Sequence, residues 1–299
     1  MKKHYFNGMC YMLASSLFIA ISAFFGKQLT STIFLTTLIT IRFFFIMMLQ
    51  WLINLFAKRT KFEFHHLGLH FLRALLTALC QFGFYYCLTH STILNATLLF
   101  LTSALFVPII SRILQKIPIK TKVLVSISIG FLGVIFILQP SANINLFPEL
   151  IGLSAGFFNA CSQIIFHQLT KKTNTYQILT FTYTFATLLS IIPLLIVLKT
   201  QAWQSITWTL SSPVIAALFF GVAVSGIINQ IFRSKAYQQV NKAMSLSPFL
   251  YMSLVFAGIL DWLVFNILPN TWSLIGIALV LVSASNLVIN YERIKLRRA

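Results

Sequence analysis

Long apolar stretches separated by short polar breaks dominate the pattern of hydrophobic and polar positions along the chain. About ten stretches occur, each close to the ~20 residues that a helix needs to cross a bilayer. They cover residues 8–26, 33–57, 67–88, 92–111, 121–139, 150–169, 178–198, 213–232, 244–267 and 271–289. Because a bilayer interior satisfies no backbone polar group, segments of this kind must be helical. The pattern therefore predicts an all-α membrane protein with ten transmembrane helices.

Lysine and arginine residues are concentrated in alternate loops of this pattern. Of the 22 Lys and Arg residues, all but Lys27, Arg42, Arg73 and Lys199 precede the first stretch, follow the second, fourth, sixth or eighth, or close the chain. Positive residues are retained in the cytoplasm during insertion, so both termini are predicted to be cytoplasmic. The first stretch has the basic start of a signal peptide but no convincing small-residue cleavage site, and we expect it to remain as a helix.

Composition supports a membrane protein and argues against other classes. Hydrophobic residues make up 58% and charged residues 9% of the chain, whereas soluble domains carry about 25% charged residues. The net charge of +18 would suggest nucleic acid in a soluble chain. Here the positive residues lie in loops beside apolar stretches. Retention of such loops in the cytoplasm and attraction to anionic lipid headgroups account for the charge, so lipids and not nucleic acid are the expected partners. No nucleotide-binding loop, C-x-x-C pair or converging set of histidines occurs, so no cofactor, metal or catalytic residue is predicted.

The ten stretches divide into two sets of five at residues 140–149. This segment has two prolines and no positive charge, and we expect it to be an external linker. With an odd number of crossings in each half, a shared fold requires the second half to enter the membrane upside down, as in secondary transporters. We expect a first five-helix repeat over residues 1–139 and a second, inverted repeat over residues 150–299.

Short motifs along nearly the whole chain resemble the drug/metabolite transporter superfamily, in its EamA-type ten-helix branch. They are Lys27, Ile41-Arg42-Phe43, Leu72-Arg73-Ala74, Phe84-Tyr85-Tyr86, Leu101 to Phe106, Ala236-Tyr237, Ser247-Pro248-Phe249, and Phe265 to Pro269 leading into Trp272 and Gly276. The spacing is most similar to the branch that includes S-adenosylmethionine uptake carriers of intracellular bacteria.

The resemblance implies a secondary active or facilitative permease of the inner membrane, either a monomer or a homodimer. By alternating access it would move a small polar metabolite, amino-acid-like or S-adenosylmethionine-like. Export of amino acids or other metabolites is the alternative. A non-transporting scaffold and an intramembrane enzyme are less favoured.

Three charged residues inside or beside apolar stretches are candidate site residues. Arg42 lies near mid-depth of its stretch, where a charge costs at least ~2.5 kcal/mol unless it faces protein or water. It is expected either to contact a substrate carboxylate or gate, or to tie helices together. Lys27 is expected to be an outer anchor or a gate cation. Asp261 is expected to form an outer-gate ion pair with Arg42 or Lys27, to act as a protonation switch, or to be a solvated helix-end acid.

Uncharged polar residues within the stretches complete the candidate set. They are Gln81, Tyr85, Asn95, Ser103, Asn159, Gln163, Gln230 and Tyr251. Gln81 and Tyr85 share one helix face, as do Asn159 and Gln163, because residues four apart are neighbours on a helix. Unpaired amides facing lipid are costly, so both faces are expected to point inward, either bonding between helices or lining a cavity. Only four acidic residues occur, which favours a solute that carries a carboxylate, a purine-like ring or both over a lipophilic cation.

The charge pattern predicts a topology that cysteine labelling checks. In a background without the four native cysteines, Ile144→Cys should react with an impermeant reagent in intact cells, whereas Lys172→Cys should not. Labelling at position 172 and not at 144 would refute the orientation.

Overall fold

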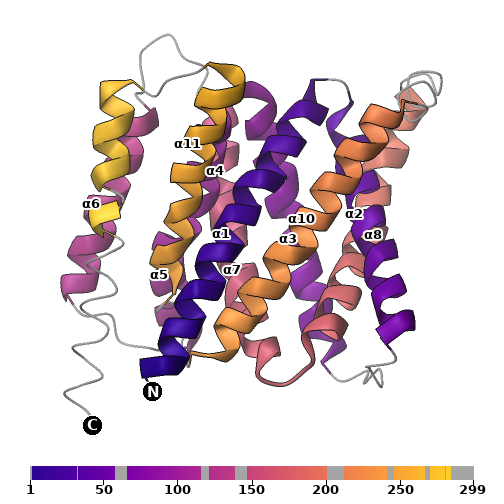
Figure 1. Ribbon diagram of the computed structural model, residues 1–299, viewed down its shortest axis with the longest axis horizontal. Helices are drawn as coiled ribbons and strands as arrows, with labels where there is room; N and C mark the ends of the chain where they lie inside the picture. The colour runs from indigo at the N-terminus through magenta and orange to yellow at the C-terminus, as the bar shows by residue number, and fades with distance from the viewer. Residues whose placement is uncertain are drawn as a thin grey trace.

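The computed structural model describes residues 2–31, 33–57, 66–115, 121–138, 147–200, 212–240, 246–266, 270–279 and 281–283, and over these residues the regular structure is helical throughout. The elements are α1 (Lys2–Thr30), α2 (Leu35–Ala57), α3 (Leu67–His90), α4 (Ile93–Leu101), α5 (Ser103–Gln115), α6 (Thr121–Leu138), α7 (Phe147–Thr170), α8 (Thr175–Thr200), α10 (Pro213–Gln238), the 3₁₀ turn η2 (Ser247–Tyr251) and α11 (Met252–Phe265) (Figure 1). Helical residues also occur over 271–279 and 281–283.

The helices have the length and composition expected of a membrane protein. Among the described residues, seven helical segments are long and apolar enough to cross a bilayer. The ninth and tenth predicted stretches fall on shorter apolar helices, of which the first runs over Phe249–Phe265. The all-α membrane fold is thus confirmed, whereas the count of ten crossings stays a prediction. The external linker lies mostly outside the described residues, as does the C-terminal end after residue 283.

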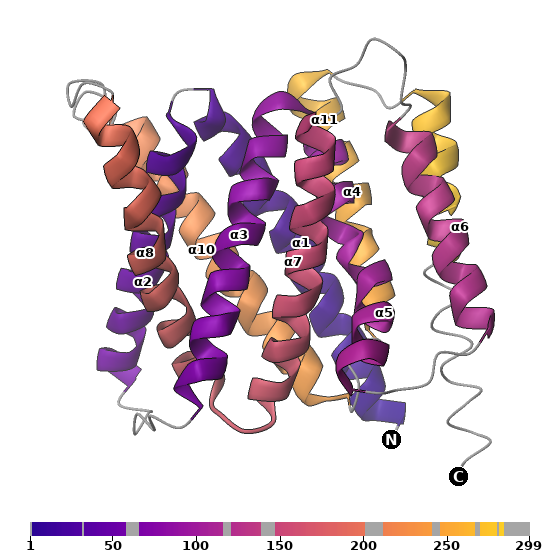
Figure 2. The ribbon, with the colours of Figure 1, turned by 180° about the vertical axis from the view of Figure 1, so that it is seen from behind.

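The bundle is built from three main helix pairs. α1 packs along α10, α3 packs along α7, and α2 packs along α8. Figure 1 shows α1, α10 and α11 on one face of the bundle, and Figure 2 shows α3 and α7 on the opposite face. α2 and α8 lie at one side of the molecule and α6 lies at the other. The buried interior between these layers receives side chains from both halves of the chain.

The fourth predicted crossing is interrupted, which the sequence pattern did not indicate. α4 ends at Leu101 and α5 begins at Ser103, with Thr102 between them. The Thr102 backbone N–H donates to both the Leu98 and Leu99 carbonyls, and its hydroxyl donates to the Leu99 carbonyl at 2.6 Å. Pro108 lies six residues after Thr102 within α5 and has no N–H to donate to the helix ladder. The break is therefore stabilised by local hydrogen bonds of Thr102.

The break coincides with a close approach of α7, made possible by small residues. A Cβ at Gly156 would meet the Thr102 hydroxyl and lie 2.5 Å from the Leu99 carbonyl oxygen. A Cβ at Gly152 would lie 2.9 Å from the Cys87 sulfur on α3. The Gly152-x-x-x-Gly156 pattern therefore lets α7 pack closely against α3 and α4, as small-xxx-small patterns do in membranes.

This close approach makes Gly156 sensitive to substitution. We expect Gly156→Ala to lower the free energy of unfolding by ~1–3 kcal/mol, because backbone atoms of α4 must move to admit the methyl group. Gly68→Ala is the matched control, since nothing lies within 4 Å of the added Cβ and alanine favours a helix. Thermal unfolding of purified variants in detergent measures both. Equal stability of the two variants would contradict the close packing.

Candidate substrate-binding site

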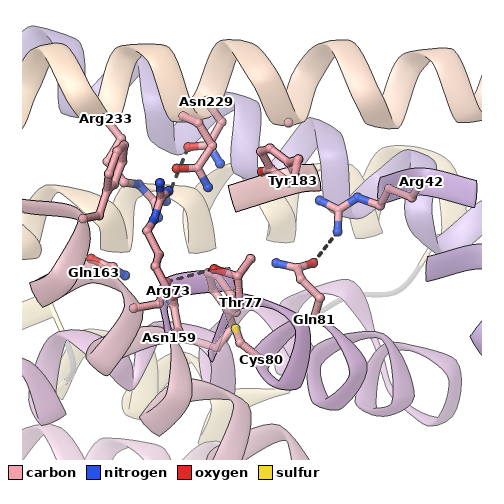
Figure 3. A pocket seen from close by; sticks show the side chains of 15 residues that line it. Arg42, Arg73, Thr77, Cys80, Gln81, Asn159, Gln163, Tyr183, Asn229 and Arg233 are labelled. Atoms are coloured by element: carbon pink, nitrogen blue, oxygen red, sulfur yellow. Dashed lines mark hydrogen bonds between the residues drawn. The ribbon is translucent and has the colours of Figure 1, made fainter. Parts of the chain in front are cut away.

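A polar cavity lies in the interior of the bundle (Figure 3). Side chains from six helices, α2, α3, α4, α7, α8 and α10, form its walls. The lining residues are Arg42, Arg73, Thr77, Cys80, Gln81, Phe100, Asn159, Ser162, Gln163, Phe166, Tyr183, Gly226, Asn229, Gln230 and Arg233. Most are polar, so the cavity is suited to a hydrophilic solute.

Arg42 reaches the cavity from α2 and is held by neutral partners. Its side chain is 7% exposed, and Nη1 donates to the Gln81 side-chain oxygen on α3. The guanidinium carbon lies 5.1 Å from the ring centroid of Tyr85, and Nε has no hydrogen-bond partner among the described residues. Arg42 therefore ties α2 to α3 and also lines the cavity, so the two predicted roles are compatible.

Arg73 and Arg233 enter the same cavity from α3 and α10. The charge pattern placed Arg233 in a cytoplasmic loop, yet Arg73 and Arg233 are each only 2% exposed. Arg73 Nη1 donates to Thr182 Oγ1 at 2.9 Å and its guanidinium carbon lies 3.8 Å from the Phe166 ring centroid. Arg233 Nη2 donates to Asn229 Oδ1 at 3.3 Å. Arg233 is internal because α10 continues to Gln238, past the predicted end at residue 232.

Amide side chains of α7 face the cavity, as the four-residue spacing predicted. Asn159 Nδ2 and Gln163 Nε2 donate to Ser103 Oγ at 3.0 and 3.4 Å. Gln163 Oε1 accepts a hydrogen bond from the Tyr237 hydroxyl at 2.6 Å. Ser103, which begins α5 next to the break, thus positions both amides by accepting a hydrogen bond from each. Gln230 also lines the cavity, and its Oε1 has no partner among the described residues.

Besides Ser103, three uncharged candidates lie outside the cavity lining. Tyr85 is buried beside Arg42, with its ring against Gly26 of α1. Asn95 is half-buried in the first turn of α4, where its backbone N–H donates to the Thr92 hydroxyl. Tyr251 is buried at the end of η2, and its hydroxyl has no partner among the described residues. The structure therefore gives these residues packing or helix-end positions and does not bring them to the cavity.

Lys27 and Asp261 meet the turn between α3 and α4, away from the cavity. Lys27 Nζ donates to the carbonyls of Leu88 and Ser91, both at 2.6 Å. Asp261 Oδ2 accepts from the Leu94 backbone N–H at 2.7 Å, where the N-terminus of a helix favours a negative charge. Each charge compensates backbone groups at a helix end. Lys27 and Asp261 also attract each other electrostatically.

Two predictions for Asp261 are corrected by this geometry. The residue is 3% exposed, so it is not a solvated helix-end acid. Arg42 lies in the cavity with Gln81, so it does not form the predicted outer ion pair with Asp261. A pairing with Lys27 is limited to attraction through space, because Lys27 donates its hydrogen bonds to backbone carbonyls and Asp261 accepts one from a backbone N–H. The sequence missed the capping role because the start of α4 is far from Asp261 along the chain.

Comparison with known proteins is consistent with this architecture. The EamA-like transporter family model matches residues 6–139 and 146–289. The chain belongs to the EamA-like transporter family. Its members are transporters, so this protein is a transporter rather than an enzyme, and a multi-pass protein of the bacterial inner membrane.

Individual relatives are distant. The chain is 24% identical over 292 residues to an S-adenosylmethionine uptake transporter of Rickettsia prowazekii, covering 97% of this chain and 95% of that protein. It is 24% identical over 214 residues to the pseudopaline exporter CntI of Pseudomonas aeruginosa, covering 71% of each. A solved crystal structure is similar with a TM-score of 0.66 and 16% identity, over 98% of this chain and 99% of that chain, which shows the fold alone.

The capping geometry predicts the effect of neutralising Asp261. We expect Asp261→Asn to lower the free energy of unfolding by ~1–3 kcal/mol, because a charged acceptor of backbone N–H groups is replaced by a neutral one. Adding Lys27→Gln should not restore stability, since it removes two further hydrogen bonds. Thermal unfolding measures both variants. Recovery in the double variant would instead support a direct ion pair.

Proposed function

We propose that this protein is a secondary active or facilitative carrier that moves a small polar metabolite across the membrane by alternating access. The solute is proposed to carry a carboxylate and to be amino-acid-like or S-adenosylmethionine-like, as the name of the Rickettsia relative suggests. Export of amino acids or other metabolites is the second candidate, favoured by similarity to a pseudopaline exporter.

The observation that carries this proposal is the polar cavity. α2, α3 and α4 from the first half of the chain and α7, α8 and α10 from the second half contribute to it. Charged side chains inside a membrane bundle are costly and commonly mark solute pathways. In secondary transporters such sites lie where two repeats meet, so that movement of one repeat against the other exposes the site to either side.

Matching helix contacts support the division into two inverted repeats. α1 packs along α10, and α7 packs along α3. α1 and α7 are the first helices of the two halves, and α3 and α10 are the third. In each pair, therefore, the first helix of one half packs along the third helix of the other half. Similar sequences also end the first helix of each half, Lys27-Gln28-Leu29-Thr30 in α1 and His167-Gln168-Leu169-Thr170 in α7. In both, the threonine hydroxyl donates to the carbonyl three residues earlier, at 2.7 Å in α1 and 2.9 Å in α7.

The same two helix ends close opposite ends of the bundle. Lys27 of α1 donates to the Leu88 and Ser91 carbonyls, where α3 ends. His167 of α7 lies 3.4 Å from the Val240 carbonyl, and Lys171 donates to the Gln238 carbonyl at 3.2 Å, where α10 ends. These contacts, here called the Lys27 latch and the His167 latch, are candidates for the two gates of alternating access.

The orientation proposed for the bundle follows from charge. The N-terminus and the turn between α7 and α8 lie at one end, which also holds the His167 latch (Figures 1 and 2). Lys171, Lys172 and Lys235 are exposed and lie toward this end. By the retention of positive residues, this end is proposed to be cytoplasmic and the Lys27 latch to be external.

Accessibility of Cys80, which lines the cavity, tests the two gates. With Cys80 as the sole cysteine, we expect Lys27→Gln to raise its reaction rate with an impermeant methanethiosulfonate from the external side by about tenfold. His167→Ala should raise the rate from the cytoplasmic side in inside-out vesicles. Lys235→Gln is the control, because Lys235 is exposed and belongs to neither latch. Equal rates in all three variants from both sides would contradict the gating assignment.

Flux into proteoliposomes tests transport itself. We expect saturable uptake of at least one labelled solute from a panel of amino acids, nucleosides, organic acids and S-adenosylmethionine. The Lys27 and His167 variants should change the flux, whereas Lys235→Gln should not. The absence of saturable flux for every member of the panel, with correctly folded protein, would overturn the proposed function.

A further inference from the structure

We infer that the cavity takes a solute with at least two acidic groups, carboxylate or phosphate, rather than a zwitterion or a cation. This inference rests on the transport activity proposed above, and it replaces the zwitterionic and S-adenosylmethionine-like solutes of that proposal with acidic ones. It depends on the balance of charge around the cavity, to which both halves of the chain contribute.

Three guanidinium groups line the cavity, and each is at least nine-tenths buried. Arg42 is 7% exposed, and Arg73 and Arg233 are each 2% exposed. Their side-chain partners are all neutral: the Gln81 amide, the Thr182 hydroxyl and the Asn229 amide. Hydrogen bonds from neutral groups spread the charge but do not cancel it. The cavity therefore carries about three positive charges, since arginine stays protonated in proteins.

No acidic residue is among those that line the described cavity. The chain has only four acids in all. Asp261 caps α4 at the outer end of the bundle, and Glu149 lies in the first turn of α7. Glu63 and Glu292 lie outside the described residues. Within the described part of the chain, the charge of the three arginines is therefore not compensated by the protein.

The arginines form two groups at opposite ends of the cavity. Figure 3 shows the side chains of Arg73 and Arg233 together at one end, and Arg42 at the other beside Gln81. Arg73 and Arg233 repel each other electrostatically, although each has a neutral hydrogen-bond partner. Between the two groups in this view lie Thr77 of α3 and Tyr183 of α8. A solute with an acidic group at each end and a polar body between them matches this distribution.

Each of the three arginines has a hydrogen-bond donor that no described residue uses. The Nε atoms of Arg42, Arg73 and Arg233 are buried and have no hydrogen-bond partner among the described residues. Guanidinium groups bind carboxylates and phosphates through two parallel hydrogen bonds. One acidic group compensates only part of the charge, and an ammonium or sulfonium group adds positive charge where the protein offers no acid. S-adenosylmethionine, which carries both an ammonium and a sulfonium group, is therefore disfavoured as the solute.

Ligand-induced stabilisation of the purified protein tests the inference. The probes are dicarboxylates of three to six carbons and phosphoglycolate, each compared with its monoamide or dephosphorylated counterpart, and S-adenosylmethionine. We expect at least one two-acid probe to raise the thermal unfolding midpoint, with an apparent Kd about 10- to 100-fold lower than that of its one-acid counterpart. The carboxylate and phosphate arms separate the two sources of acidity. The inference is wrong if S-adenosylmethionine or a one-acid probe binds as tightly as every two-acid probe.

Charge-neutralising variants assign the effect to the cavity. Arg73→Gln and Arg42→Gln should each weaken binding of the two-acid probe about 10-fold or more, while Arg73→Lys should retain more affinity than Arg73→Gln. Lys235→Gln removes an exposed positive charge and should leave the affinity unchanged. The unfolding midpoint without ligand reports whether each variant folds. Equal weakening by Lys235→Gln would indicate a nonspecific charge effect and overturn the assignment.

Uptake into proteoliposomes separates failure of this inference from failure of the proposed function. Saturable uptake of a two-acid probe, inhibited by other two-acid probes, supports both. Saturable uptake of S-adenosylmethionine or a neutral amino acid without competition from two-acid probes retains the transporter and overturns the acidic substrate. Absence of binding and flux for every probe overturns both.

Discussion

The interior of this bundle is governed by the need to compensate every charge that is withdrawn from water. A buried ion without partners is costly, so charged groups within a membrane bundle bond to backbone, to other side chains or to a solute. At the helix ends this requirement is met by the backbone: Lys27 binds the carbonyls that end α3, and Asp261 binds an N–H group that begins α4. In the cavity it is met only by neutral amides and a hydroxyl, and the charge of the arginines is left for a solute.

Close packing determines where these charges meet. Gly152 and Gly156 allow α7 to approach α3 and α4, and this approach brings Asn159 and Gln163 within hydrogen-bond distance of Ser103. The break at Thr102 lies at the same level. Ser103 begins a new helix there and turns its hydroxyl toward α7. A continuous, bulkier interface would separate the amides from their acceptor, so the polarity of the cavity depends on small residues outside its lining.

Local sequence patterns predicted those features that depend on one helix. The apolar stretches predicted the helical fold. The four-residue spacing of Asn159 and Gln163 predicted a shared inward face, and both side chains line the cavity. Features that depend on the pairing of distant helices were missed. Arg233 resembles a loop residue because it lies among basic residues, but α10 extends to Gln238 and packs along α1. Asp261 resembles a gate acid, but its backbone partner Leu94 lies 167 residues earlier in the chain.

The chemistry of the two latches bears on how a carrier can open at low cost. If each end were closed by a buried ion pair, opening would leave two unpaired charges, a loss of ~3–5 kcal/mol when one partner is removed. Here the acceptors are backbone carbonyls at helix ends, which water can satisfy as soon as the end is exposed. Lys27 and His167 are half-buried, so both also reach water with small movements. The central arginines are at least nine-tenths buried and have only neutral side chains as hydrogen-bond partners, so they lack this alternative. Opening either end therefore costs little free energy, whereas uncompensated charge in the cavity costs much. Together these two effects favour movement of the carrier when an acidic solute is bound.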